Sequence, residues 1–259
     1  MTKDNQNINT SKGKLTVVGA GPGDIELITI KAVKALEEAD AVLYDALVNP
    51  ELLDYCKNAD LLYVGKRKGC YAYQQEQIND LIIQYGNTHG NVVRLKGGDP
   101  FIFGRGAEEM EYAASKGMEV SMIPGLSSSV SVPAMQNIPV TKRGSSESFW
   151  VITATTKEHK LSNDIYVAAK SNATVVILMG MHKLGQIVEA FKNEAKNEVS
   201  VAIIQNGTRD TEKVGIGTIE TIEAIVAEKK LSSPAIIVIG EVVKHREQLA
   251  AFRWQLNEL

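Results

Sequence analysis

The chain has 259 residues, of which 44% are hydrophobic and 23% are charged, and its formal net charge is -3. These values are typical of a globular protein, so they exclude a disordered or fibrous chain and argue against general nucleic-acid binding. No apolar run approaches the roughly 20 residues that a membrane-spanning helix needs. Residues 1–13 are polar and lack the apolar centre of a signal peptide, which predicts a flexible N-terminal leader.

Cysteine and histidine usage narrows the chemistry further. The chain has two cysteines, Cys56 and Cys70, which suits a reducing cytoplasm better than a disulfide framework. The four histidines are scattered without the spacing of metal ligands, so we expect no metal site.

The first half of the chain alternates strands, loops and helices. Apolar runs predict strands at residues 14–18, 41–44, 61–64, 91–93 and 119–123, and helical spacing predicts helices at 29–39, 50–56, 74–85 and 106–116. This alternation predicts a mostly parallel sheet with helices on its faces. The glycine-rich loop at residues 19–24 lacks the third glycine of a dinucleotide fingerprint, and Pro22 removes a backbone N–H, so we do not expect a nicotinamide cofactor.

The loop at residues 94–106 has the strongest functional signal. Gly97 and Gly98 would let a bound molecule approach the backbone, and Asp99 could accept hydrogen bonds from hydroxyl or ammonium groups. Arg105 follows closely and could bind an anion. In a parallel sheet, such a loop at the carboxyl end of a strand faces a ligand.

The pattern changes after residue 125. Residues 126–146 contain small residues and two prolines, and strands are predicted again at 149–153, 174–179, 199–205 and 235–239. Residues 214–218 follow a short turn and should pair antiparallel with 199–205. We therefore expect two α/β domains, at 14–125 and 147–259, joined by a connection at 126–146, with the active site in the cleft between them.

Taken together, the motifs are similar to those of the tetrapyrrole methylases, and the resemblance extends from Lys14 to about Glu247. The motifs that carry it are 17–24 (VVGAGPGD), 44–48 (YDALV), 64–67 (VGKR), 94–106 (RLKGGDPFIFGRG), 123–125 (IPG), 138–144 (IPVTKRG) and 179–181 (MGM). The VGKR and GRG segments favour the members of this family that methylate uroporphyrinogen III.

The resemblance implies an S-adenosylmethionine-dependent enzyme that methylates uroporphyrinogen III at C2 and C7. The product is precorrin-2, formed via precorrin-1, on the branch toward sirohaem and cobalamin. It also implies a homodimer, with Asp45 as proton acceptor and Lys66 as proton donor. The residues that bind the methyl donor would be Pro22, Gly97, Gly98, Asp99, Ile102, Ser127, Ser128, Met179 and Gly207.

The acceptor carries eight carboxylates, so we expect a locally basic site in this weakly acidic protein. The candidate cations are Lys66, Arg67, Lys68, Lys96, Arg105, Lys142 and Arg143. Arg105 should matter most, because a guanidinium can bind a carboxylate through two hydrogen bonds. Two alternatives stay open: a methyltransferase acting on a later precorrin, and a non-catalytic tetrapyrrole-binding or nucleotide-binding regulator with the same fold.

Overall fold

The structure is a computed structural model that describes residues 13–65 and 73–250. The chain divides into two compact units, the first ending at Leu126 and the second beginning at Ser127. Each unit contains one five-stranded sheet. The fold is therefore of the α/β class, as predicted. Among the described residues, no helix has the length and apolar character needed to cross a membrane.

The first unit is a parallel sheet covered by helices on both faces. Its strands are β1 (Lys14–Gly19), β2 (Ala41–Tyr44), β3 (Asp60–Tyr63), β4 (Asn91–Lys96) and β5 (Glu119–Ile123). Its helices are α1 (Ile30–Glu37), α2 (Gln75–His89) and α3 (Gly106–Ser115), with short 3-10 turns η1 (Ile25–Leu27) and η2 (Pro50–Tyr55). The strand order is β3-β2-β4-β1-β5, and every pairing in it is parallel.

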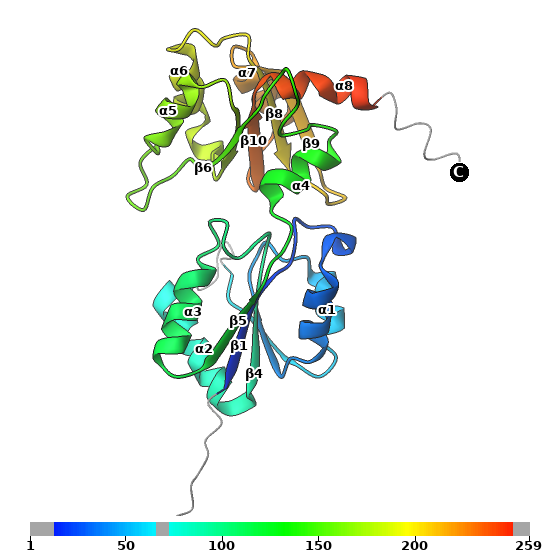
Figure 1. The fold of residues 1–259 in the computed structure, drawn as a ribbon, viewed down its shortest axis with the longest axis vertical. Helices are drawn as coiled ribbons and strands as arrows, with labels where there is room; N and C mark the ends of the chain where they lie inside the picture. The colour runs from blue at the N-terminus through cyan, green and yellow to red at the C-terminus, as the bar shows by residue number, and fades with distance from the viewer. Residues whose placement is uncertain (1–12, 66–72, 251–259) are drawn as a thin grey trace, which may run out of the picture. The chain divides into compact units, whose positions relative to one another are not determined.

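Two apolar clusters hold this unit together, one on each face of the sheet. Ala32 and Leu36 of α1 pack on one face, and Ile82 of α2 and Ala113 of α3 pack on the other. Figure 1 shows the same arrangement, with α1 on one side of the strands and α2 and α3 on the opposite side. Because all five strands run in one direction, the loops that follow them emerge at one edge of the sheet.

The second unit has a mixed sheet. Its strands are β6 (Phe149–Thr153), β7 (Thr174–Leu178), β8 (Ser200–Gln205), β9 (Lys213–Thr218) and β10 (Ala235–Ile239). Its helices are α4 (Ser128–Met135), α5 (Asp164–Lys170), α6 (Leu184–Lys192), α7 (Ile222–Lys229) and α8 (His245–Ala250), with 3-10 turns η3 (Met181–Lys183) and η4 (Glu241–Lys244).

The order of this second sheet is β6-β7-β10-β8-β9. Only β6 and β7 pair in parallel, and the other three pairings are antiparallel. The antiparallel pairing predicted for residues 199–205 and 214–218 is confirmed, with Ile203 opposite Gly215. Since β10 lies antiparallel between β7 and β8, the carboxyl ends of β7 and β8 lie at the same edge.

The segment predicted as a connection, residues 126–146, is largely part of the second unit. Its first residues form α4, and Val132 of this helix packs with Ile204 and Val238 of the sheet. Ile138, just after the helix, is fully buried in the same cluster. The division between the units at Leu126 follows from this packing, because the small residues and Pro133 are held against a sheet rather than exposed in a linker.

Candidate active site

Three loops of the first unit meet backbone to backbone at the carboxyl edge of its sheet. The Gly98 N–H donates to the Gly21 carbonyl at 2.7 Å, and the Gly21 N–H donates back at 3.2 Å. Gly98 has φ +70, and a Cβ placed on Gly125 would lie only 2.3 Å from the Gly98 carbonyl oxygen. Side chains larger than hydrogen are therefore excluded where these loops cross. The loops after β1, β4 and β5 are therefore closely packed at this edge of the sheet.

Asp99 connects two of these loops through its carboxylate. One oxygen, Oδ1, accepts the Phe101 N–H at 2.8 Å, and Oδ2 accepts the Gly125 N–H at 3.2 Å. The side chain is half-buried, so it has both a structural role and access to the edge. Ile102 lies in the following turn and is exposed, whereas Pro22 and Gly97 are half-buried. The predicted donor-binding residues of the first unit thus lie on adjoining loops.

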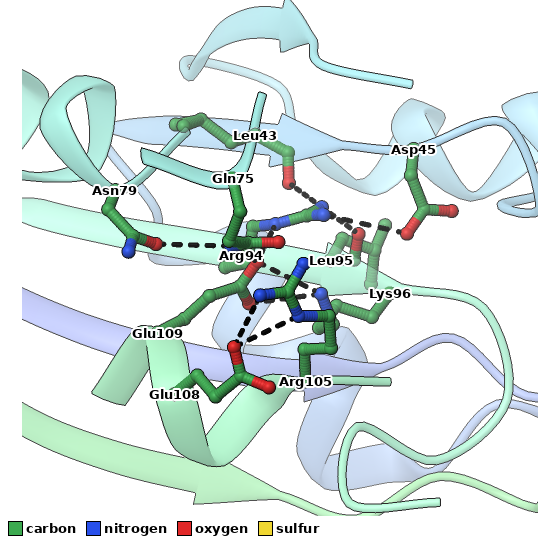
Figure 2. Close-up of polar contacts among 10 residues, drawn as sticks. All are labelled: Leu43, Asp45, Gln75, Asn79, Arg94, Leu95, Lys96, Arg105, Glu108 and Glu109. Atoms are coloured by element: carbon green, nitrogen blue, oxygen red, sulfur yellow. Dashed lines mark hydrogen bonds and ion pairs between the residues drawn. The ribbon is translucent and has the colours of Figure 1, made fainter. Parts of the chain in front are cut away.

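Asp45 lies immediately after β2, which pairs with β4. Its Oδ1 accepts the Leu47 N–H at 3.0 Å, and its Oδ2 lies 3.6 Å from Nη2 of Arg94. The Asp45 side chain is 24% exposed, whereas Arg94 is buried inside the unit. The carboxylate thus contacts a buried cation, as Figure 2 shows, and is itself partly exposed.

A buried acid, Glu109 of α3, balances two cations from β4. Its Oε1 lies 3.2 Å from Nε of Arg94, and both of its oxygens lie 3.0 Å from Nζ of Lys96. Gln75 of α2 also donates to Oε1, at 3.2 Å. Figure 2 shows the Arg94, Lys96 and Glu109 side chains converging between β4 and α3. We call Arg94, Lys96, Glu109 and Asp45 the β4 charge cluster.

The position of Lys96 differs from the expectation of a cation open to a carboxylate ligand. Lys96 is only 5% exposed, and Glu109 pairs with its ammonium. Burial, followed by the positive charge of Arg94, lowers the pKa of Lys96 below its ordinary value, against the opposing attraction of Glu109. Its ammonium is already paired inside the unit, so we leave it out of the proposed acceptor-binding residues.

The remaining predicted cations have different positions. Arg105 is the N-terminal cap of α3 with φ +61, is half exposed, and donates from Nε to Glu108 at 3.0 Å. In the second unit, Lys142 and Arg143 are exposed, and the Lys142 ammonium lies 2.9 Å from Nδ1 of His245. Lys66, Arg67 and Lys68 lie outside the described residues.

The predicted donor-binding residues of the second unit lie at the edge where β7 and β8 end. Met179 follows β7 and is 54% exposed. Its backbone has φ +56, which is unusual for a residue other than glycine. Gly207 follows β8, and a Cβ there would lie 2.3 Å from Cγ1 of Val132 in α4. Ser127 caps α4, with its Oγ accepting the Ser129 N–H at 3.3 Å, and Ser128 is half-buried. Through Val132, α4 packs on the same sheet and lies next to Gly207.

Sequence reasoning missed Arg94 and Glu109 as parts of the site. A signal was present, because Arg94 and Lys96 alternate with Val93 and Leu95 directly after the predicted strand at 91–93. Two cations on one buried strand require an acid nearby, and Glu109 stands in the next helix. Only the fold could show that Glu109, and not Glu108, faces inward.

The sequence profile of the Tetrapyrrole (Corrin/Porphyrin) Methylases matches residues 14–223. The chain belongs to this family. This tetrapyrrole methylase is 44% identical over 234 residues to uroporphyrinogen-III C-methyltransferase of Methanocaldococcus jannaschii, covering 89% of the chain and 97% of the relative. It is 37% identical to siroheme synthase of Thiobacillus denitrificans, covering 98% of the chain but only 54% of that longer relative.

Among solved structures, this tetrapyrrole methylase is similar to uroporphyrin-III C-methyl transferase from Thermus thermophilus complexed with S-adenosylhomocysteine. The TM-score is 0.78 at 31% sequence identity, and the match covers 90% of this chain and 99% of the other. The predicted family and fold class are therefore confirmed.

Proposed function

We propose that this chain transfers methyl groups from S-adenosylmethionine to C2 and C7 of uroporphyrinogen III, giving precorrin-2 via precorrin-1 for sirohaem and cobalamin synthesis. The observation that carries the proposal is the 44% identity to a uroporphyrinogen-III C-methyltransferase over 97% of its length. The solved relative with bound S-adenosylhomocysteine, which is the donor after methyl transfer, supports the choice of donor.

The residues at the two sheet edges have the chemistry that the methyl donor needs. The donor has an ammonium, a carboxylate and ribose hydroxyls, so it requires an acceptor such as Asp99 and small residues that permit close approach. In the first unit we assign donor binding to Pro22, Gly97, Gly98, Asp99 and Ile102. In the second unit we assign it to Ser127, Ser128, Met179 and Gly207. When bound, the donor supplies an activated methyl group on a sulfonium.

The protein's main task is to align the reactants, because the pyrrole carbon is already electron-rich. Methyl transfer leaves a positive charge on the macrocycle, which must then lose a proton. Asp45 accepts this proton: a C–H bond of the macrocycle breaks, its electrons neutralise the macrocycle, and an O–H bond forms on the carboxylate. We assign proton donation to Lys66 from the resemblance.

The eight carboxylates of the acceptor are bound by the exposed cations Arg105, Lys142 and Arg143, together with Arg67. A guanidinium can hold a carboxylate through two parallel hydrogen bonds, and Arg105 is half exposed next to the donor loop. For Arg105, binding requires exchanging its Glu108 partner for a ligand carboxylate. That exchange costs little, because exposed ion pairs contribute about 0–1 kcal/mol.

The direct test measures release of S-adenosylhomocysteine when purified chain, S-adenosylmethionine and uroporphyrinogen III are combined without oxygen. The expected products are precorrin-1 and precorrin-2, identified by their absorption spectra. If S-adenosylhomocysteine were released only with a later precorrin, that precorrin would be the acceptor. If no tetrapyrrole caused its release, the chain would be a binding protein and not an enzyme. Asp45→Asn is the matched variant, and it should retain donor binding while losing turnover.

We also propose that the enzyme acts in the cytoplasm as a homodimer. The family resemblance supports the dimer, and the buried free thiol of Cys56 suits a reducing compartment. Light scattering of the purified chain should give twice the mass of 28.2 kDa. A mass of one chain at micromolar concentration would contradict this assignment.

A further inference from the structure

Arg94 is an unusual residue for the centre of a parallel sheet. It is 3% exposed in β4, between β1 and β2, where an unpaired cation would be strongly destabilising. Every nitrogen of its guanidinium has a partner. Nε donates to Glu109 at 3.2 Å, Nη1 donates to the carbonyls of Leu95 and Leu43 at 2.9 and 3.3 Å, and Nη2 faces Asp45. The residue therefore links a buried acid to a surface acid.

The charges of the cluster show why this link matters. Glu109 is shared by Arg94 and Lys96, so a single buried negative charge faces two buried cations. The remaining positive charge is nearest to Asp45, through the 3.6 Å contact between Nη2 and Oδ2. Because charges interact more strongly away from water, this contact restrains rotation of the carboxylate. The backbone N–H of Leu47 fixes the other oxygen, Oδ1.

A carboxylate that takes a proton from a substrate must be both ionised and correctly oriented. We propose that Arg94 is the positioning residue for Asp45: anchored by Glu109, it holds that carboxylate in the orientation for proton abstraction at the carboxyl edge of the sheet. This role rests on the proposed function, in which Asp45 is the proton acceptor. Arg94 acts through Asp45 and needs no contact with either reactant.

The test compares Arg94→Met with Arg94→Lys and Lys96→Met in the full chain. Lys96→Met is the matched comparison, because Lys96 is on the same strand, is equally buried and shares Glu109, but its ammonium pairs with Glu109 instead of Asp45. For each variant, we would measure kcat and KM with uroporphyrinogen III, the Kd of S-adenosylhomocysteine by calorimetry, and the far-ultraviolet circular dichroism.

Arg94→Met should lower kcat by about 10–100-fold, since a general base contributes up to about 10²–10⁴-fold and Asp45 stays in place. KM and the Kd of S-adenosylhomocysteine should change less than about threefold, because the loss lies in the reaction step. Arg94→Lys should recover part of kcat, because it restores the positive charge without the forked geometry. Lys96→Met should lose less kcat than Arg94→Met.

Three results would overturn this role. The first is a kcat of Arg94→Met within threefold of wild type, and the second is an equal loss of kcat in Lys96→Met. The third is that Arg94→Met loses kcat and donor binding together, and that Arg94→Lys recovers neither. If Arg94→Met does not fold, the kcat and the donor binding of Arg94→Lys decide whether Arg94 has this role. A lowered kcat with unchanged donor binding supports the role, and an unchanged kcat removes it. Failure of the proposed function is separate, because it appears as an inactive wild-type chain.

Discussion

Replacing Glu109 by Gln should destabilise the first unit more than any other single charge removal in the β4 charge cluster. The Glu109 side chain is fully buried, and among the described residues it is the only acid that forms ion pairs with both Arg94 and Lys96. Gln keeps the shape and one acceptor oxygen but leaves two buried cations without a negative charge between them. Removing one partner of a buried ion pair costs about 3–5 kcal/mol.

Urea unfolding of the full chain can measure this loss in the first unit. Cys56 is buried in the apolar cluster beneath α1, so its thiol becomes reactive when this unit opens. A Cys70→Ser background makes Cys56 the only cysteine. With a urea dependence of about 1–3 kcal/mol per M, the midpoint should fall by about 2 M.

The matched control is Glu108→Gln, one residue earlier in the same helix. Glu108 pairs with Arg105 but is 55% exposed, so its removal should cost about 0–1 kcal/mol. Adding Lys96→Met to Glu109→Gln should restore part of the stability by removing one stranded cation. Equal midpoints for the Glu108 and Glu109 variants would refute the view that Glu109 neutralises the buried cluster.

Three further predictions concern the ligand loops and the free thiol. Arg105→Ala should raise the KM for uroporphyrinogen III while donor binding stays near normal, and unchanged kinetics would remove Arg105 from the acceptor site. Asp99→Ala should weaken S-adenosylhomocysteine binding at least about tenfold by calorimetry, because a charge-assisted acceptor is lost, and retained affinity would contradict the donor-loop assignment. Burial raises the pKa of Cys56 to about 11, from 9.0, so in the Cys70→Ser chain this thiol should be labelled slowly at pH 8 without urea. Because the unfolded chain loses this proton more easily, the folded state should lose stability as the pH rises from 9 to 11. Fast labelling at pH 8 would show that the thiol is accessible.

The sequence predicted the strands well where they are continuous apolar runs, as in β2 and β10. The predicted strand ended at Val93, because Arg94 and Lys96 interrupt the apolar pattern. In the structure β4 continues to Lys96. The acid that permits this burial lies on α3, more than ten residues further along the chain. Local patterns do not contain such a partner, so the charge cluster could not be predicted from them.

The same limit applies to α4 and to Asp99. Ser127–Ser129 and Pro133 favour an irregular segment, but burial of Val132 against the second sheet outweighs this weak local preference. Asp99 was predicted correctly to lie at a loop after a strand, yet the sequence could not show that its carboxylate holds the N–H of Gly125. Contacts between distant loops depend on the strand order, which local spacing does not determine.

The position of β1 between β4 and β5 has a consequence for synthesis of the protein. This strand leaves the ribosome before the other described strands, yet both of its neighbours, β4 and β5, come much later in the sequence. At about 5–20 residues per second, β1 is made several seconds before β4 can pair with it. During that interval its apolar residues and both of its edges are open to other chains. A nascent chain that stalls before Asn91 therefore exposes an apolar strand that has neither of its partners, and such a chain is open to aggregation.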